Sequence, residues 1–441
     1  MEKKVYIIGI GGIGISAIAR YYNENGYQVF GSDKVGSELI EKLKSEGINI
    51  IIGEDESRIS SDFNIVVYTE AVPENQEELE KARSLGIETI TYPESLARIA
   101  NDKKLIAISG SHGKSTTTSL ISIMLKNSSL DINTVVGTLL KEFDGKNAFF
   151  SNSEYFSIEA CEYKRSFLRY KPYIGIITNI DLDHLDYYKD LADYESAFTD
   201  FIKNIKTGGY AILNGNCESS MKMLQVRNDI NYVIVYNNSE IKLNNEIIKV
   251  PHINMQIPGD HILFDAHIAF AVGKILGLEE NEIIKSLEAY TGVWRRSEIV
   301  GTTENGNILM SDYGHHPTEI SLTLDALKER NPDKKLFVVF QPHQYSRTLE
   351  LLDGFSHCFN SADTLVIPDI YESRDSAESI AAMNTEILLN HINHPNKING
   401  NGLKNTLEII KQYDIENPNS SIILLLGAGN VDDLRYDIET K

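Results

Sequence analysis

Residues 105–116 read LIAISGSHGKST, an apolar strand that runs directly into a glycine-containing loop and a helix start. The usual phosphate-binding loop has four residues between its glycines. This loop has two, but it keeps a buried strand, two glycines, Lys114 to reach terminal phosphates and the Ser115 hydroxyl to bind Mg²⁺. The alternative is a chance Gly-Lys-Ser in a polar turn, which the strand before it and Thr116–Thr118 after it disfavour. The predicted nucleoside triphosphate site comprises Gly110, Ser111, His112, Gly113, Lys114, Ser115 and Thr116.

Short β-branched runs alternate with amphipathic segments of helical length along the whole chain. This alternation predicts an α/β fold with parallel, doubly wound sheets. The first strands are expected at Lys3–Ile10, Tyr27–Asp33, Asn49–Gly53 and Phe63–Thr69, with helices at Gly14–Asn25 and Gly36–Glu46. The pattern restarts at Leu105 and again after Trp294, which predicts three domains: residues 1–101, 102–293 and 294–441.

The two later domains have their own expected strands. They are Leu105–Gly110, Tyr155–Ala160 and Tyr173–Asn179 in the central domain, and Ile308–Tyr313, Leu336–Gln341, Thr364–Ile370 and Ser421–Leu426 in the last. A helix is expected at Gly113–Lys126. Residues 228–256 are expected as short strands and turns that decorate the central domain.

The composition is that of an ordinary globular protein and fits the cytoplasm. The 441 residues carry 42 basic and 63 acidic side chains, a net charge of −21, which argues against a general nucleic-acid binder. No run approaches the roughly 20 apolar residues of a membrane helix, and a strand begins directly after Met1, so we expect no signal peptide and no membrane partner. Three cysteines, none in a Cys-x-x-Cys pair, fit a reducing compartment.

A second glycine-rich loop lies near the start of the chain. Gly9-Ile10-Gly11-Gly12-Ile13-Gly14 follows a strand and opens a helix, and Asp33 ends the next strand. Such glycines let the backbone approach a pyrophosphate at a helix N-terminus. The loop predicts a diphosphate-bearing ligand; the alternative is a tight turn with no ligand.

Acidic and imidazole groups follow two central strands. Glu159 ends one strand, and the run Asn179–Asp186, which contains His184, follows the next. Ligands collect at the carboxyl ends of strands in open α/β sheets. We therefore expect a divalent metal at Ser115, Glu159 and His184. For His184 alone, a histidine that caps a turn is the alternative.

Basic and aromatic residues gather in the last domain. Arg295 and Arg296 precede the segment Asp312–Pro317, and Gln341–Arg347 follows another strand. Guanidinium groups pair with carboxylates in bidentate fashion, so these residues suit recognition of a carboxylate. The alternative is a set of turn residues and helix starts.

Together these motifs resemble the Mur ligase family along the whole chain and in the family's order. Gly9–Gly14 resembles its uridine-diphosphate loop, and Gly110–Thr118 resembles its ATP loop. Glu159–Glu162 and Asn179–His184 resemble its metal-binding segments. The stretch Asp312–Ile320 resembles the members that join L-alanine to UDP-N-acetylmuramate.

The resemblance implies an N-terminal Rossmann-like UDP-binding domain, a central P-loop ATPase domain and a C-terminal Rossmann-like domain for the amino acid. It implies ATP-dependent ligation of L-alanine to UDP-N-acetylmuramate through an acyl phosphate, with Mg²⁺, in a monomer or homodimer. The implied catalytic residues are Lys114, Glu159, His184 and Arg295. The implied UDP-sugar contacts are Gly11, Gly12, Ile13, Gly14, Ser32, Asp33 and Thr69. The implied alanine contacts are Tyr313, His315, His343 and Arg347.

The sequence departs from the family pattern in three places, one of which, Ser111 and Ser115 in place of the usual threonines, keeps the hydroxyls. The family's His-Asn-x-x-Asn-Ala, whose asparagines hold adenine, here reads His261-Ile262-Leu263-Phe264-Asp265-Ala266. Asp265 can still accept a hydrogen bond from the adenine amino group, so we count it among the ATP contacts and expect weaker ATP binding. Gln344 stands where an arginine is frequent.

Three other readings stay open. One is a recycling ligase that joins a whole peptide to UDP-N-acetylmuramate. The segment 313–320 argues against this alternative. Another is a dehydrogenase that binds a nicotinamide cofactor at Gly9–Gly14, which leaves the Lys114 loop unexplained. The third is a catalytically weakened relative that binds nucleotide.

Overall fold

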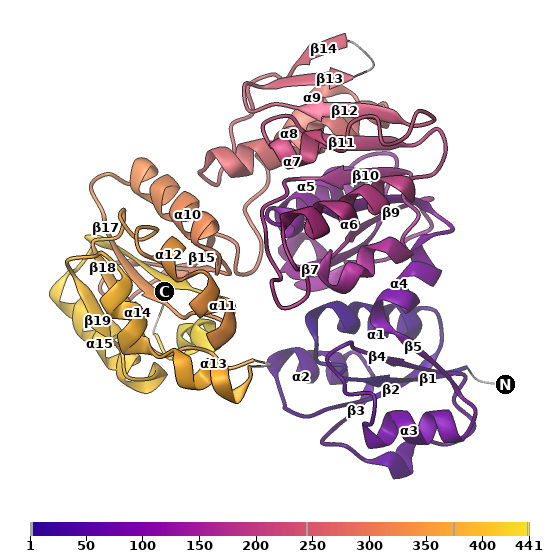
Figure 1. Cartoon of the computed structure of the whole chain (residues 1–441), viewed down its shortest axis with the longest axis horizontal. Helices are drawn as coiled ribbons and strands as arrows, with labels where there is room; N and C mark the ends of the chain where they lie inside the picture. Colours follow the sequence, from indigo (N-terminus) through magenta and orange to yellow (C-terminus); the bar gives the residue numbers. More distant parts are fainter. Residues whose placement is uncertain (1–2, 244–245, 374, 439, 441) are drawn as a thin grey trace. The chain divides into compact units, whose positions relative to one another are not determined.

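The computed structural model describes residues 3–243, 246–373, 375–438 and 440. Contacts divide the chain into two compact units (Figure 1), Met1–His252 with Asp265–Leu287 and Ile253–Phe264 with Glu288–Lys441. Two sheets lie in the first unit and one in the second, so the predicted α/β class with three sheets is confirmed. None of the helices in the described ranges combines the length and apolar character needed to cross a bilayer.

The first sheet contains five parallel strands in the order β3-β2-β1-β4-β5, with the crossover after β3 that is typical of nucleotide-binding α/β folds. Its strands are β1 (Lys4–Ile8), β2 (Gln28–Asp33), β3 (Asn49–Ile52), β4 (Ile65–Tyr68) and β5 (Glu88–Thr91). Its helices are α1 (Ile13–Glu24), α2 (Glu38–Ser45), α3 (Glu77–Ser84) and α4 (Tyr92–Ala100). The strand β5 was not predicted because its sequence, Glu-Thr-Ile-Thr, contains a single apolar residue.

The second sheet has nine strands in the order β14-β13-β12-β11-β10-β6-β9-β7-β8. Its strands are β6 (Lys104–Ser109), β7 (Asn133–Leu140), β8 (Lys146–Phe149), β9 (Tyr155–Glu159), β10 (Ile174–Ile177), β11 (Tyr210–Asn214), β12 (Asn231–Val235), β13 (Glu240–Leu243) and β14 (Glu246–Lys249). Its helices are α5 (Lys114–Lys126), α6 (Leu191–Lys203), α7 (Glu218–Met221), α8 (Asp260–Ile275) and α9 (Glu280–Glu288). One buried cluster joins both sheets of the unit and contains Ile7, Ala17 and Phe156.

The segment 228–256 contains the predicted short strands, but their place in the domain differs from the expectation. It does not decorate the domain, because β12 pairs parallel with β11 and the hairpin β13–β14 continues the same sheet. Short strands with exposed side chains, such as Ile247, give little apolar signal, so the sheet extension could not be read from periodicity. Asn244 and Asn245 lie outside the described residues.

The third sheet has the order β15-β16-β20-β17-β18-β19, parallel except for β15 at one edge. Its strands are β15 (Glu298–Thr302), β16 (Ile308–Asp312), β17 (Lys335–Phe340), β18 (Thr364–Ile367), β19 (Lys397–Asn399) and β20 (Ser421–Leu426). Its helices are α10 (Pro317–Arg330), α11 (Tyr345–Glu350), α12 (Leu352–Phe355), α13 (Ala377–Ala382), α14 (Thr385–His391) and α15 (Leu403–Glu416).

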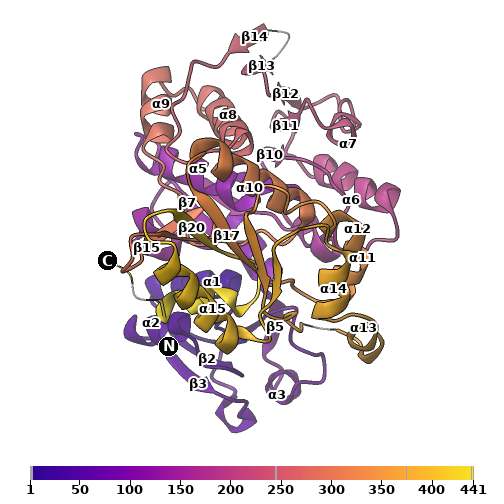
Figure 2. The same cartoon turned by 90° about the vertical axis from the view of Figure 1, so that its left-hand side faces the viewer.

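Alternate residues of the third sheet pack on opposite faces. Val338 and Leu424 belong to the buried cluster that contains α10 and α14 residues, whereas Val339 and Leu425 belong to the cluster that contains Ile410 of α15. Figure 2 shows α10 and α15 with the strands β17 and β20 of this unit. Both faces are therefore covered, as in doubly wound sheets.

Candidate active site

The loop after β6 contains a glycine, Gly110, at which any larger residue would clash with its neighbours. Gly110 has φ 134°, and a Cβ at this position would lie 2.1 Å from the Thr178 hydroxyl oxygen. Gly113, with φ 80°, directly precedes α5. The loop therefore delivers Lys114 and Ser115 to the first turn of a helix, where backbone N–H groups and the helix dipole favour an anion.

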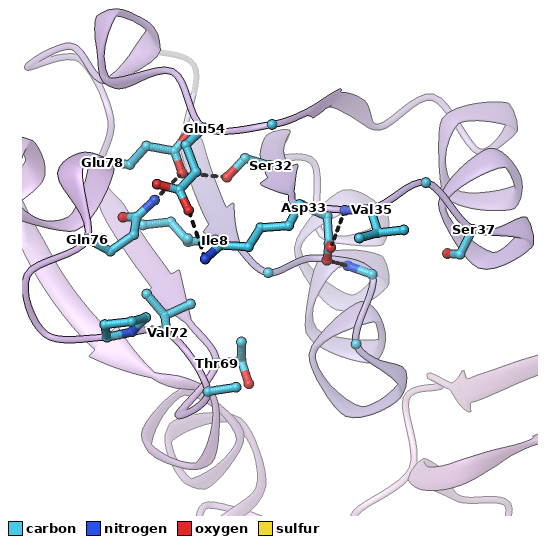
Figure 3. A pocket seen from close by; sticks show the side chains of 18 residues that line it. Ile8, Ser32, Asp33, Val35, Ser37, Glu54, Thr69, Val72, Gln76 and Glu78 are labelled. Carbon is cyan, nitrogen blue, oxygen red and sulfur yellow. Dashed lines mark hydrogen bonds and ion pairs between the residues drawn. The ribbon is translucent and has the colours of Figure 1, made fainter. Parts of the chain in front are cut away.

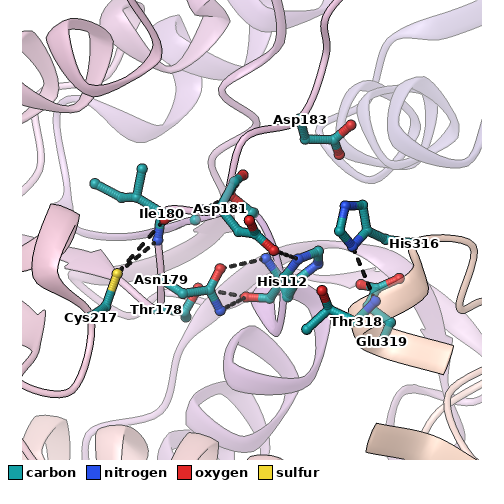
Figure 4. A network of polar contacts seen from close by, with 12 residues as sticks. His112, Thr178, Asn179, Ile180, Asp181, Asp183, Cys217, His316, Thr318 and Glu319 are labelled. Carbon is teal, nitrogen blue, oxygen red and sulfur yellow. Dashed lines mark hydrogen bonds and ion pairs between the residues drawn. The ribbon is translucent and has the colours of Figure 1, made fainter. Parts of the chain in front are cut away.

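Residues after β10 fix the shape of this loop (Figure 4). The backbone N–H of His112 donates to Oδ1 of Asn179 at 2.9 Å, and the Asn179 amide donates back to the His112 carbonyl at 3.1 Å. Ser111 donates through its hydroxyl to the Asp181 carbonyl at 2.6 Å. The His112 ring nitrogen Nε2 lies 3.3 Å from a carboxylate oxygen of Asp181. These contacts connect the predicted phosphate loop to the segment that carries His184.

Lys114 and His184 meet at the carboxylate of Glu162, which ends the segment that resembles a metal-binding segment but was not itself predicted as a catalytic or metal-binding residue. The Glu162 side chain is fully buried, and its Oε1 lies 3.1 Å from Lys114 Nζ and 3.4 Å from His184 Nε2. Burial by itself would lower the pKa of Lys114 and is the largest single influence, but Glu162, Cys161 and Glu159 together outweigh it and the pKa is raised. Burial by itself would raise the pKa of Glu162, but the Lys114 charge and the His184 hydrogen bond hold it below its usual value. Both groups are therefore charged at neutral pH.

Ser115 and Glu159 form a second pair next to the first. The Ser115 hydroxyl donates to Oε2 of Glu159 at 2.9 Å, and the backbone N–H of Gly137 donates to the same oxygen at 2.9 Å. A hydroxyl and a carboxylate are oxygen ligands of the kind that Mg²⁺ prefers. The donor chemistry of this pair fits the predicted cation.

Asp265, in α8, lies beside the phosphate loop. Its side chain is buried, and a Cβ added to Gly113 would come within 2.8 Å of its Oδ1. A carboxylate at this distance from the loop adds negative charge where a phosphate is expected.

A cavity of about 460 Å³ opens beside the first sheet (Figure 3). Of the seven predicted UDP-sugar contacts, five line it: Gly11, Gly12, Ser32, Asp33 and Thr69. The Gly11 N–H donates to Oδ2 of Asp33 at 2.8 Å, so Asp33 holds the glycine-rich loop in place.

Ile13 and Gly14 form the first turn of α1 and are not among the residues that line this cavity. At Gly14 a Cβ would lie 2.9 Å from the Tyr92 ring, so this glycine permits close packing of α1 against α4. The glycine pattern alone cannot separate a ligand contact from a packing contact.

The buried carboxylate of Glu78 lies in the wall of the cavity and was not predicted. Its oxygens accept hydrogen bonds from the Ser32 hydroxyl at 2.6 Å, the Tyr6 hydroxyl at 2.8 Å and the Gln76 amide at 2.9 Å. These donors fix Ser32 and Gln76 in the lining. Because Glu78 belongs to a charged helical segment, no pattern in the sequence marks it.

In the second unit, Arg295 and Tyr313 lie together at the carboxyl edge of the third sheet. The Arg295 guanidinium is buried and donates to the carbonyls of Gly427 and Gly429, which follow β20. Its guanidinium carbon lies 4.9 Å from the centre of the Tyr313 ring. Burial lowers the pKa of Arg295 from its usual value. In this arrangement the guanidinium supports the edge of its own sheet.

The other predicted alanine contacts lie at the same edge. His315 follows β16 and lies 3.2 Å through Nδ1 from the Tyr313 carbonyl. His343 follows β17 and stacks on the Tyr371 ring, with centroids 5.3 Å apart. Arg347 lies in the first turn of α11. The Gln344 amide donates to the Ser373 carbonyl at 2.7 Å, which anchors the turn between β17 and α11.

Sequence models of one family match nearly the whole chain. The Mur ligase family catalytic domain matches residues 4–104, the Mur ligase middle domain residues 108–273, and the Mur ligase glutamate ligase domain residues 295–429. The chain belongs to the Mur ligase family. The Lys114 loop and the acidic residues Glu159 and Glu162 thus lie within this family's middle domain.

Individual members of the Mur ligase family are similar over almost their full length. The UDP-N-acetylmuramate–L-alanine ligases of Clostridium acetobutylicum and Clostridium novyi are 38% and 37% identical, and each comparison covers 98% of this chain and 96% of the relative. The crystal structure of the UDP-N-acetylmuramate-alanine ligase from Thermotoga maritima matches with a TM-score of 0.79 at 23% identity, covering 98% of this chain and 97% of that one. At that identity the structural match shows a shared fold.

Proposed function

We propose that this Mur ligase is a UDP-N-acetylmuramate–L-alanine ligase that uses ATP. The observation that carries the proposal is the phosphate loop with Lys114 and the adjacent Ser115–Glu159 pair. The proposal is supported by the 38% identity to a curated enzyme of that name along 98% of the chain. We further propose domains at residues 1–101, 102–293 and 294–441, a cytoplasmic location, and a monomer or homodimer.

The chemistry requires activation of a carboxylate, because a carboxylate does not react with amines at neutral pH. A carboxylate oxygen of the lactyl group attacks the γ-phosphorus of ATP, the bond to the β-phosphate oxygen breaks, and ADP leaves. The amine of L-alanine then attacks the carbonyl carbon of the acyl phosphate. Inorganic phosphate leaves with the bridging oxygen, the amine loses a proton, and an amide remains.

Lys114 would neutralise charge on the transferred phosphoryl group. Its raised pKa keeps it an ammonium throughout the neutral range. Ser115 and Glu159 would hold Mg²⁺, which supplies a positive charge to the phosphate oxygens. His184, 3.4 Å from the Glu162 carboxylate, is our candidate for a second cation on the substrate side.

The cavity of the first sheet would hold the UDP moiety, with Gly11 and Gly12 at the diphosphate and Ser32, Asp33 and Thr69 in the lining. For the amino acid we propose Tyr313, His315, His343 and Arg347. Arg295 would act at the nucleotide, although its guanidinium donates to the Gly427 and Gly429 carbonyls in this structure. Asp265 would accept a hydrogen bond from adenine.

The test is release of phosphate from ATP by the purified full chain. We expect release only when UDP-N-acetylmuramate and L-alanine are both present, with UDP-N-acetylmuramoyl-L-alanine as product, and none after chelation of Mg²⁺ with EDTA. Turnover with L-alanyl-γ-D-glutamyl-diaminopimelate but not with L-alanine would replace the proposal by the recycling ligase. Binding of nucleotide without turnover would replace it by the catalytically weakened relative.

A further inference from the structure

The hairpin of β7 and β8 contacts both candidate sites of the first unit. On β7, Gly137 donates its N–H to the Glu159 carboxylate that also accepts from Ser115. On β8, Asn147 contacts helix α1, which begins directly after the glycine-rich loop of the cavity. Figure 1 shows α1 between the first sheet and β7, and α1 packs against both strands of the hairpin.

The nitrogen and the oxygen of the Asn147 side-chain amide both form hydrogen bonds with α1. Its side chain is fully buried, and its Nδ2 donates to the Ile13 carbonyl and to the Ser16 hydroxyl oxygen, the latter at 3.1 Å. Its Oδ1 accepts a hydrogen bond from Nη1 of Arg20. Ile13 is the first residue of the helix and Arg20 lies two turns later, so one side chain fixes both the start and the direction of α1.

The surrounding charges leave Arg20 little freedom. Arg20 is 1% exposed and makes two hydrogen bonds to Glu46, 2.8 Å from Nε to Oε2 and 3.0 Å from Nη2 to Oε1. Lys42 of α2 reaches the same hairpin and donates to the Gly145 carbonyl at 2.7 Å. Removal of the Asn147 amide would leave the buried Nη1 of Arg20 without its acceptor, which costs more than the hydrogen bond itself, whereas the Ser16 hydroxyl would still donate to the Ile13 carbonyl.

The start of α1 matters because it presents the N–H groups and the positive end of the helix dipole to an anion bound at Gly11 and Gly12. We propose that Asn147 is a positioning residue for the diphosphate of the UDP-sugar. It belongs to the domain that we assign to ATP, and it holds the start of α1 in the position that binds the diphosphate. The inference rests on the proposed function. The hairpin then fixes, through Gly137 and Asn147, the distance between the carboxylate that we assign to Mg²⁺ and the loop that we assign to the diphosphate.

Two substitutions test the amide. Asn147→Ala removes all three contacts. Asn147→Asp keeps the side-chain volume and the pairing with Arg20 but loses both donors to the start of the helix. Because loss of buried hydrogen bonds at the helix start is the cause, we expect each variant to raise the Kd for UDP-N-acetylmuramate about tenfold, measured by calorimetry, with the KM for ATP changed less than about twofold.

Asn133 offers a matched control in the same hairpin. It is also a buried asparagine, and its amide donates to the carbonyls of Ser153 and Tyr155 at 2.9 and 3.0 Å, away from α1. Asn133→Ala is expected to lower the melting temperature as Asn147→Ala does while leaving the Kd for UDP-N-acetylmuramate within about twofold of the wild type.

An unchanged Kd in Asn147→Asp, or an equal rise in Asn133→Ala, would overturn the positioning role while the wild-type enzyme still ligates L-alanine. A wild-type chain that binds no UDP-N-acetylmuramate would overturn both this inference and the proposed function. The two failures are therefore distinguished by the wild-type measurement alone.

Discussion

The Lys114 ammonium lies 3.1 Å from Oε1 of Glu162, a carboxylate with no exposed surface. The second oxygen of Glu162, Oε2, is buried without a hydrogen-bond partner among the described residues. A buried ion pair is costly to break because the remaining charge keeps its desolvation penalty. Together with the Gly110 and Ser111 carbonyls, which also accept hydrogen bonds from Lys114, Glu162 holds the ammonium in place before a phosphate binds.

The first prediction concerns this pair. Glu162→Ala should lower the free energy of unfolding by about 3 kcal/mol, because it leaves the Lys114 ammonium buried without a counter-ion. It should also raise the KM for ATP. Urea denaturation and steady-state kinetics measure the two effects. In the control, Glu154→Ala removes a surface pair with Lys104, whose side chains are 61% and 45% exposed, and should cost less than about 1 kcal/mol. Equal, small losses in both variants would contradict the role of Glu162.

The second prediction separates the two nucleotide sites. Lys114→Ala should abolish ligation, a loss of at least about a thousandfold in kcat, since the charge at the transferred phosphoryl group is missing. The Kd for UDP-N-acetylmuramate should stay within about twofold, because the cavity of the first sheet does not include Lys114. Loss of both ligation and UDP-N-acetylmuramate binding in Lys114→Ala would refute the assignment of the two nucleotides to separate sites. Lys104→Ala, at the exposed start of β6, serves as the control.

The third prediction concerns Asp265, whose carboxylate lies next to Gly113. Asp265→Asn removes a negative charge beside the phosphate loop and should tighten ATP binding about threefold to tenfold by calorimetry. Asp260→Asn, at the exposed start of the same helix, should leave the Kd unchanged. Tight ATP binding by the wild type that does not respond to Asp265→Asn would show that position 265 does not limit affinity.

The fourth prediction concerns pH. Burial lowers the pKa of His267 in α8 from 6.5 to about 4. The unfolded chain therefore binds a proton between these values that the folded chain does not, so stability falls as pH falls below 6.5. Between pH 7 and pH 5 this histidine should account for about 2 kcal/mol of the lost unfolding free energy.

Urea denaturation at both pH values measures this difference. His267→Leu should reduce the pH dependence by that amount, and His252→Leu, at an exposed position, should not. The same pH dependence in wild type and His267→Leu would exclude the histidine as its source.

Much of the architecture could be read from local patterns. Ser421–Leu426 has the predicted bounds, and β6, with its loop and helix, begins and ends within one residue of the prediction. Long apolar strands followed by glycines leave a signal in the chain itself. By contrast, β7 and β8 were not predicted, because polar residues such as Asn133, Thr134 and Asn147 interrupt their apolar sequence although these side chains are buried.

The sequence by itself determined the parts: three α/β segments, a loop with a lysine and a hydroxyl for a triphosphate, and a glycine-rich loop for a diphosphate. Each is encoded within a few neighbouring residues, so periodicity and spacing reveal it. Only the tertiary structure decided which side chains meet. Glu162 lies 48 residues from Lys114, and Asn147 lies 131 residues from Ser16. Such contacts arise from parallel strand order and helix packing, and no local pattern records them.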